Sequence, residues 1–136
     1  MMNGPWSIEA NAQGNLEFGG CELAALAKRY GTPLYVMNED VVRDKIRRYL
    51  KSLKTQYPNS HVAYACKAFM CTWMCEVAMD EGLFLDVVSG GELYIATRSG
   101  FPSERILFHG NNKSPHEVEM GIRMGVGRFV VDNYYE

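Results

Sequence analysis

The sequence predicts an α/β fold in which parallel strands alternate with helices, and the spacing of its apolar runs is the first reason. Four short runs end at positions 66, 88, 109 and 132, so that successive ends lie 22, 21 and 23 residues apart. Capping residues and a helical segment follow the first three runs, which is typical of right-handed βαβ units. The length of 136 residues is the second observation, because it excludes a closed eight-stranded barrel of roughly 200 residues or more.

Residues 1–32 are predicted to form an N-terminal arm followed by a helix. The first 20 residues contain many Gly and Asn residues and give only a weak strand signal at 16–18. Gly31 ends the helix, as glycine commonly does. The helix itself is predicted from apolar side chains at helical spacing, namely Leu23, Leu26, Ala27 and Tyr30.

Residues 33–136 are predicted to form part of the α/β domain. A short strand is predicted at 34–37, and Asn38 is a favourable N-cap for the helix that follows and that Pro58 ends. That helix has one apolar face, made of Val42, Ile46, Tyr49, Leu50, Leu53 and Tyr57.

The four apolar runs are the predicted parallel strands, at 61–66, 83–88, 106–109 and 128–132. Two of the helices between them begin with a predicted capping box, formed by Ser89 with Glu92 and by Ser114 with Glu117. Glycines at 100 and 125 are predicted to end these helices.

Charge and composition exclude several classes of function. The chain has 14 Lys and Arg residues against 16 Asp and Glu residues, a net charge of -2, so it lacks the basic surplus that nucleic-acid binding needs. No run approaches the roughly 20 apolar residues that cross a bilayer. The N-terminus has no basic region followed by an apolar core, so we expect no secretory signal and a cytoplasmic location.

The cysteines are interpreted as reduced thiols that serve mainly for packing. Three of them are close together in the sequence, but their spacing misses the common C-x2-C pairs and no fourth ligand lies at a standard distance. We therefore predict no metal site. The four residues are Cys21, Cys66, Cys71 and Cys75.

Polar residues at the strand ends are the candidate functional residues, because the carboxyl ends of parallel strands face the ligand in α/β folds. Lys67 continues the first run, Asp86 lies in the second, and His109 ends the third. Burial of a lysine that continues an apolar strand would lower its pKa and favour a nucleophilic amine. An ion pair between Lys67 and Asp86 remains open as the alternative.

Ser89, Gly90 and Gly91 form a second candidate site, because a helix N-terminus can hold a phosphate group. The capping box already accounts for Ser89 and Glu92, so this signal is weak. His109 alone is ambiguous as well, since a single histidine is more often a hydrogen-bonded structural group than a catalytic one.

Four blocks of the sequence resemble the diaminopimelate decarboxylase family. They are Tyr-Ala-Cys-Lys-Ala-Phe at 64–69, Leu-Asp-Val-Val-Ser-Gly-Gly-Glu-Leu at 85–93, Gly-Phe-Pro at 100–102 and Ile-Leu-Phe-His-Gly-Asn-Asn-Lys-Ser at 106–114. The likeness runs from about 31 to 132. The family belongs to the pyridoxal-phosphate enzymes with an alanine-racemase-like barrel, which also include ornithine and arginine decarboxylases.

The resemblance implies a partial (β/α)8 barrel, about its first half, and decarboxylation of meso-2,6-diaminopimelate to L-lysine and CO2. It implies that Lys67 is the catalytic lysine and bonds to pyridoxal phosphate. It also implies that Asp86 and His109 line the cofactor site, with Ser89 as a weaker candidate. The expected partners are a small amino-acid substrate and, for the full-length enzyme, a second copy in a homodimer.

Two other interpretations stay open at this point. A decarboxylase or racemase for another amino acid, such as ornithine, arginine or carboxynorspermidine, would share the lysine strand. A non-catalytic pyridoxal-phosphate binder or a structural α/β segment would need Lys67 only as an ion-pair partner. Because the strand series stops at an open sheet edge, we expect a longer protein, and we expect these 136 residues alone to be unstable and inactive.

Overall fold

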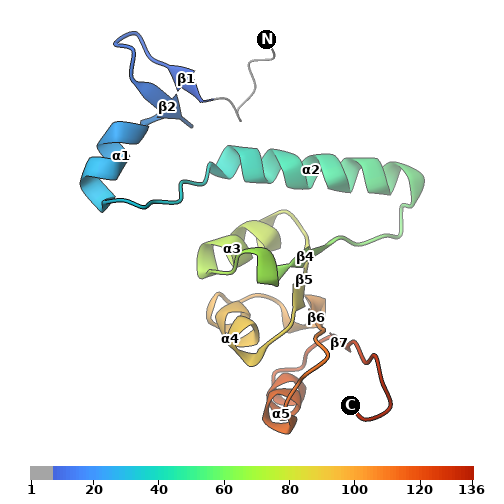
Figure 1. Ribbon diagram of the computed structural model, residues 1–136. Coiled ribbons are helices and arrows are strands. Elements are labelled where there is room, and N and C mark those ends of the chain that lie inside the picture. The colour runs from blue at the N-terminus through green and yellow to red at the C-terminus, as the bar shows by residue number, and fades with distance from the viewer. Residues whose placement is uncertain (1–7) are drawn as a thin grey trace. The chain divides into compact units, whose positions relative to one another are not determined.

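The computed structural model describes residues 8–136 (Figure 1). The chain divides into two compact units, one that ends at Arg48 and one from Tyr49 to Glu136. The domain boundary predicted between residues 32 and 33 lies before this division and stays a prediction. The part of the predicted arm at residues 1–7 lies outside the described residues.

The first unit begins with a small antiparallel sheet in which β2 lies between its two sequence neighbours. The side chain of Asn11 closes the first turn, where its Oδ1 accepts hydrogen bonds from the backbone N–H groups of Gln13 and Asn15. The predicted arm is therefore folded into hairpins over its described part. The strands are β1 (Glu9–Ala10), β2 (Leu16–Phe18) and β3 (Cys21–Glu22).

Two helices follow this sheet, as predicted. Helix α1 covers Leu23–Tyr30 and helix α2 covers Glu39–Gln56. Asn38 caps α2, because its Oδ1 accepts hydrogen bonds from the N–H groups of the first helical residues. The strand predicted at 34–37 is wrong: this segment pairs with no strand within residues 8–136, and Tyr35 is fully exposed. A strand needs a partner that periodicity alone cannot supply.

The second unit alternates strands and helices around a parallel sheet with the order β4-β5-β6-β7. The prediction of a parallel α/β fold is confirmed, with strands shorter than the apolar runs. The elements are β4 (Ala63–Ala65), η1 (Cys66–Ala68), α3 (Thr72–Asp80), β5 (Phe84–Val87), α4 (Gly90–Arg98), η2 (Ser103–Arg105), β6 (Ile106–Phe108), α5 (Pro115–Arg123) and β7 (Arg128–Phe129).

Glycine ends α4 and α5 at the predicted positions. Gly100 and Gly125 have φ angles of 72° and 69°, a conformation that glycine adopts without steric cost. The residue after each glycine donates a hydrogen bond back into its helix, from Phe101 to the Ala96 carbonyl and from Val126 to the Gly121 carbonyl. This Schellman arrangement returns the chain to the next strand.

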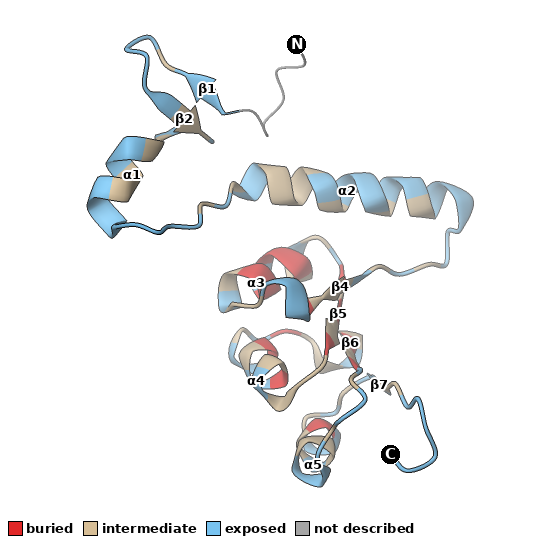
Figure 2. Ribbon diagram, in the orientation of Figure 1, coloured by how far each residue is buried: buried red, intermediate tan, exposed pale blue. Residues whose placement is uncertain are grey.

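The two faces of this sheet differ in burial. Helices α3, α4 and α5 all lie on one side of it (Figure 1), and that face carries the fully buried core (Figure 2). Its strand residues are Leu85, Val87, Ile106 and Phe108. The residues that alternate with them, such as Asp86 and Leu107, are only half-buried. The four strands form an open sheet. Its half-buried face and the carboxyl ends of its strands are therefore the parts that can contribute to a site.

Within residues 8–136, none of the helices combines the length and the apolar composition that a bilayer span requires.

Candidate functional site

The carboxyl ends of β4, β5 and β6 form one rim because the three strands run parallel. Asp86 lies in β5, in register with Ala65 of β4 and Leu107 of β6. His109 directly follows β6, and its backbone N–H donates a 2.8 Å hydrogen bond to the Val87 carbonyl. The structure therefore brings these two predicted site residues together at one edge.

Asp86 and His109 form a close polar pair across this rim. The Nδ1 atom of His109 lies 3.4 Å from Oδ1 of Asp86, and the two side chains are 49% and 27% exposed, respectively. The interaction is an ion pair only when the imidazole is protonated. A carboxylate with an adjacent imidazole on a partly open rim can hold charge and bind a polar ligand.

Lys67 lies near this rim but outside the strand. The chain leaves β4 after Ala65 and enters η1, which carries Lys67 as its middle residue. Its side chain is exposed, so the expected burial of the amine at the strand end is wrong. The structure gives Lys67 no hydrogen bond or ion pair within residues 8–136, and the carboxylate of Asp86 contacts His109 instead. The alternative Lys67–Asp86 ion pair is therefore not formed in this structure.

The residues on either side of Lys67 are anchored. The hydroxyl of Tyr64 donates a 2.8 Å hydrogen bond to the Phe69 carbonyl, which bridges the segment that contains Lys67. Cys66 is 1% exposed, and burial, with smaller contributions from Glu92 and other nearby groups, raises the pKa of its thiol to about 12. Cys66 is thus a neutral packing group, and the exposed amine beside it is held on a fixed piece of backbone.

The loop between β5 and α4 is bonded to carboxylates of the protein itself. The Ser89 hydroxyl accepts a 3.3 Å hydrogen bond from the Glu92 N–H group, as a capping residue does. Glu92 returns its carboxylate to the N–H group of Val88 at 2.7 Å instead of to Ser89, which corrects the predicted capping box. The N–H group of Gly90 donates to Glu117 at 2.7 Å. The role of Ser89 in phosphate binding stays a prediction.

Glu117 has a role that the sequence analysis identified only in part. The reciprocal capping box with Ser114 is confirmed. The second oxygen of the same carboxylate binds the N–H group of Gly90, 27 residues earlier. Hydrogen bonds from Ser114 and Gly90 lower the pKa of Glu117. The capping motif gave the local contact, but no local pattern predicts the contact with the preceding loop.

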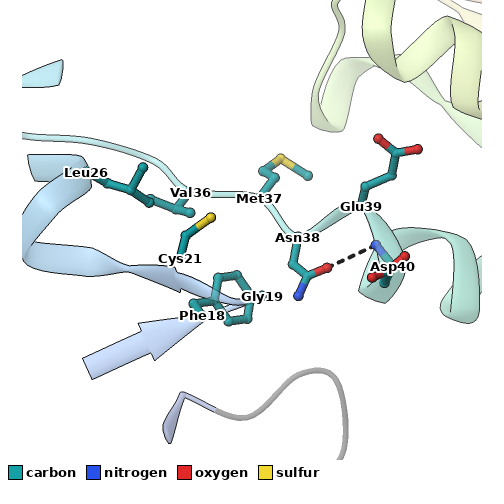
Figure 3. Close-up of a pocket in the computed structure, with 9 residues that line it drawn as sticks. All are labelled: Phe18, Gly19, Cys21, Leu26, Val36, Met37, Asn38, Glu39 and Asp40. Atoms are coloured by element: carbon teal, nitrogen blue, oxygen red, sulfur yellow. Dashed lines mark hydrogen bonds between the residues drawn. The ribbon is translucent and has the colours of Figure 1, made fainter. Parts of the chain in front are cut away.

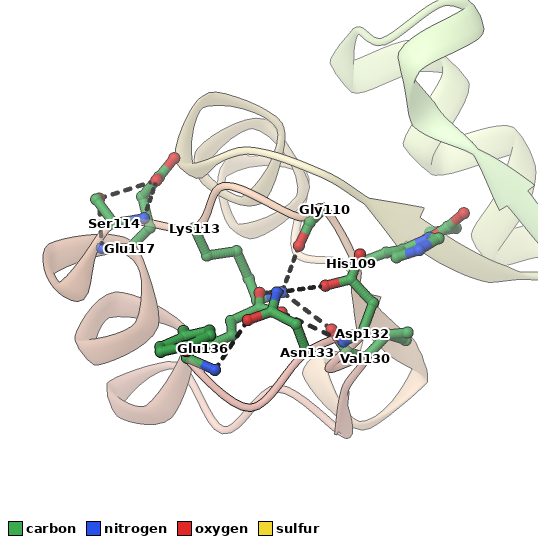
Figure 4. Close-up of polar contacts among 11 residues, drawn as sticks. His109, Gly110, Lys113, Ser114, Glu117, Val130, Asp132, Asn133 and Glu136 are labelled. Atoms are coloured by element: carbon green, nitrogen blue, oxygen red, sulfur yellow. Dashed lines mark hydrogen bonds and ion pairs between the residues drawn. The ribbon is translucent and has the colours of Figure 1, made fainter.

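Lys113 is a second residue whose role the sequence analysis missed. Its ammonium group is enclosed among backbone carbonyls and the Glu136 carboxylate near the end of β7 (Figure 4). The side chain is 1% exposed. A buried position is uncommon for lysine unless its charge is paired. Its position in the Ile-Leu-Phe-His-Gly-Asn-Asn-Lys-Ser block at 106–114 was the only sequence signal.

One described pocket is lined by other residues than those of the rim. It belongs to the first unit, has a volume of about 500 Å³ and is lined by residues that include Phe18, Cys21, Met37 and Asp40 (Figure 3). None of the predicted site residues lines it. The candidate site is therefore defined by side-chain chemistry at the rim and not by this pocket.

Residues 43–136 match the family described as pyridoxal-dependent decarboxylase, pyridoxal binding domain. The chain is 48% identical over 126 residues to the diaminopimelate decarboxylase of Halalkalibacterium halodurans, and equally to that of Bacillus subtilis. Each alignment covers 93% of this chain and 29% of the relative. The chain thus spans less than a third of the length of these curated relatives.

The fold of this chain is similar to that of solved decarboxylase structures. A crystal structure of diaminopimelate decarboxylase from M. jannaschii in complex with L-lysine matches with a TM-score of 0.82 and 36% identity, over 93% of this chain and 30% of that chain. A lysine/ornithine decarboxylase from Vibrio vulnificus, complexed with cadaverine, matches with a TM-score of 0.70 and 26% identity, over 83% and 30%. The predicted fold, the first part of a barrel of this kind, is confirmed.

Proposed function

This chain belongs to the pyridoxal-dependent decarboxylases, and from that premise we propose that it forms the cofactor-anchoring part of a diaminopimelate decarboxylase. The proposed reaction removes one carboxylate of meso-2,6-diaminopimelate as CO2 and leaves L-lysine. The observation that carries the proposal is the exposed amine of Lys67, which lies just after the carboxyl end of β4, near the rim that carries the Asp86–His109 pair. The 48% identity to proteins with this activity supports the choice of substrate.

The cofactor of this family is pyridoxal phosphate, and the residues at the rim fit its aldehyde end. An exposed primary amine with no partner among residues 8–136 is the group that bonds to an aldehyde carbon. Asp86 and His109 add an acceptor and an imidazole at the carboxyl ends of the neighbouring strands. The Gly90 N–H group is already bonded to Glu117, so the described residues do not offer this amide to the phosphate end.

When bound, pyridoxal phosphate supplies an electron-withdrawing ring that takes up the electron pair left behind as CO2 departs. Lys67 would hold the cofactor through its ε-nitrogen, because its amine is exposed and has no partner among residues 8–136. The Asp86 carboxylate lies 3.4 Å from Nδ1 of His109, where it would orient the imidazole at the rim. One proton replaces CO2 on the same carbon, so the atoms of the reaction balance.

A decarboxylation assay of the intact protein, loaded with pyridoxal phosphate, tests the proposed function. We expect CO2 release from meso-2,6-diaminopimelate with a kcat/KM well above that for ornithine, arginine or carboxynorspermidine. Lys67→Ala should abolish it, whereas Lys54→Met, an exposed change on α2, should leave it intact. A preference for one of the other amino acids would contradict the proposed substrate.

A decarboxylase for lysine or ornithine is the second candidate, because a lysine/ornithine decarboxylase also matches the fold at a TM-score of 0.70. Release of CO2 and cadaverine from L-lysine by the same preparation would favour it. Diaminopimelate and lysine differ by one carboxylate, so these two substrates separate the two candidates directly.

We also propose that the intact enzyme is a cytoplasmic homodimer that binds a small amino acid and neither nucleic acid nor membrane. Light scattering of the intact protein is expected to give twice the mass of one chain. A monomeric mass with full activity would contradict the dimer.

A further inference from the structure

Lys113 places a buried positive charge at the carboxyl edge of the sheet. It lies in the loop between β6 and α5, immediately before the capping residue Ser114. Its Nζ donates hydrogen bonds to the Gly110 carbonyl at 2.5 Å and to the Val130 carbonyl at 3.0 Å, and it forms an ion pair with the Glu136 carboxylate (Figure 4). We call this set of contacts the Lys113 clamp.

The clamp joins the ends of two neighbouring strands. Gly110 lies two residues beyond β6, and Val130 directly follows β7. The backbone N–H group of Val130 also donates a 2.9 Å hydrogen bond to the Phe108 carbonyl. The ladder between β6 and β7 is thus continued beyond the strands by a side chain.

Burial makes the clamp specific to one geometry. The Lys113 side chain is 1% exposed and the Glu136 side chain is 8% exposed. Burying an ammonium group is costly unless it is paired and hydrogen-bonded, and this one has three acceptors. A lysine needed only for solubility would keep its charge in water.

The clamp acts on the backbone that carries His109. On one side, the His109 N–H group is fixed by the Val87 carbonyl at 2.8 Å. Gly110, with a φ of 96°, packs so closely that an added Cβ would lie 2.7 Å from the Val88 carbonyl oxygen. On the other side, the Gly110 carbonyl is held by Lys113. The backbone of His109 and Gly110 is therefore held by β5 on one side and by the clamp on the other.

We propose that Lys113 is a positioning residue that holds His109 in place beside Asp86. This inference rests on the proposed function only insofar as His109 contributes to the reaction. Lys113 itself touches no reacting group, because its ammonium is enclosed by protein acceptors.

Amide hydrogen exchange of the intact protein, without cofactor or substrate, tests the positioning directly. In Lys113→Met we expect the His109 amide to exchange faster by about tenfold or more, relative to the amides of β5 in the same sample. Lys54→Met removes a positive charge from an exposed position and should change neither rate. Equal acceleration at His109 and in β5, or no acceleration at His109, would overturn the proposal.

Lys113→Arg carries the same test if the Met variant does not fold. Arginine keeps the charge but changes the donor geometry, so we expect the same selective acceleration at His109 with a smaller size. An unchanged His109 rate in a folded Arg variant would overturn the proposal.

A double-mutant cycle on kcat/KM adds a catalytic readout. We expect Lys113→Met to lower kcat/KM by about 10- to 100-fold, in keeping with a displaced active-site group. In a His109→Gln background the same change should cost less than about threefold, because two residues that act as a unit are not additive. Effects that multiply in the double variant would contradict an action through His109. Because the exchange test needs no turnover, its failure and a failure of the proposed decarboxylation are distinguishable.

Discussion

The two faces of the β4–β7 sheet are made by alternate residues of the same strands, and they differ in both burial and chemistry. On the face packed by helices, Leu85, Val87 and Phe108 are fully buried. On the opposite face, the Asp86 side chain is 27% exposed, and the adjoining His109 side chain is 49% exposed. Because side chains alternate along a strand, stability and polar chemistry are separated by a single residue step. Substitutions at adjacent strand positions should therefore have different effects: those on the buried face should lower stability, and those on the opposite face should alter the polar rim.

Phe108→Ala should give the largest loss in the free energy of unfolding. Phe108 is fully buried and its ring centroid lies 5.7 Å from that of Phe129. Removing the ring should cost about 3–5 kcal/mol in the free energy of unfolding, measured by urea denaturation of the intact protein. Leu107→Ala, on the half-buried face, is the matched control and should cost less than half as much. Equal losses would show that the two faces do not differ in packing.

Gly110→Ala should be the next largest change, because it strains the rim without touching the core. Gly110 has a φ of 96°, and its Cβ would lie 2.7 Å from the backbone oxygen of Val88. We expect a loss of about 2 kcal/mol or more in the free energy of unfolding. Gly100→Ala has a similar φ of 72° but open space around the added carbon, so it should cost about 1 kcal/mol. The contact with Val88 is unimportant if the two variants are equally stable.

Ser114→Ala and Ser89→Ala compare the N-terminal caps of α5 and α4. Ser114 takes part in a reciprocal capping box with Glu117, so its loss should cost about 1 kcal/mol. Ser89→Ala removes a single 3.3 Å hydrogen bond from the Glu92 N–H group and should cost roughly half of that. Thermal unfolding of both variants checks the order, and a larger loss at Ser89 would reverse our assignment of the two caps.

Cys66 should have no effect on the pH dependence of stability at neutral pH and should contribute only at high pH. Burial raises the pKa of its thiol from 9.0 to about 12. Below pH 9 the thiol is protonated in both the folded and unfolded states, so its contribution to stability is fully present. As the pH rises from 9 towards 12, the unfolded chain loses the proton first and unfolding is favoured. Urea midpoints at several pH values should fall faster in this range for the wild type than for Cys66→Ala, and parallel curves would contradict the burial of this thiol.

Much of the fold could be predicted from local patterns. The spacing of the apolar runs gave the four parallel strands, and Ser114 with Glu117 gave the start of α5. The strand at 34–37 was predicted wrongly, because pairing depends on residues distant in the sequence. Strand ends were also misjudged: β4 stops at Ala65, so Lys67 is exposed rather than buried.

The proximity of Asp86 and His109 could be predicted from the sequence, but most of the polar contacts around the rim could not. Asp86 and His109 were placed on one rim by topology alone, and they lie 3.4 Å apart. The bond from Gly90 to Glu117 and the bond from Lys113 to the Val130 carbonyl join positions 27 and 17 residues apart. Such contacts follow from packing of neighbouring βα units, which no single local motif describes.

The ε-nitrogen of Lys67 is the proposed attachment point of the cofactor. Borohydride reduction of the intact protein with bound pyridoxal phosphate, followed by peptide mapping, tests it most directly. We predict a label on Lys67 alone, no label on the buried Lys113, and none in Lys67→Ala. A label on another lysine, or no label in a folded protein that binds the cofactor, would contradict the account.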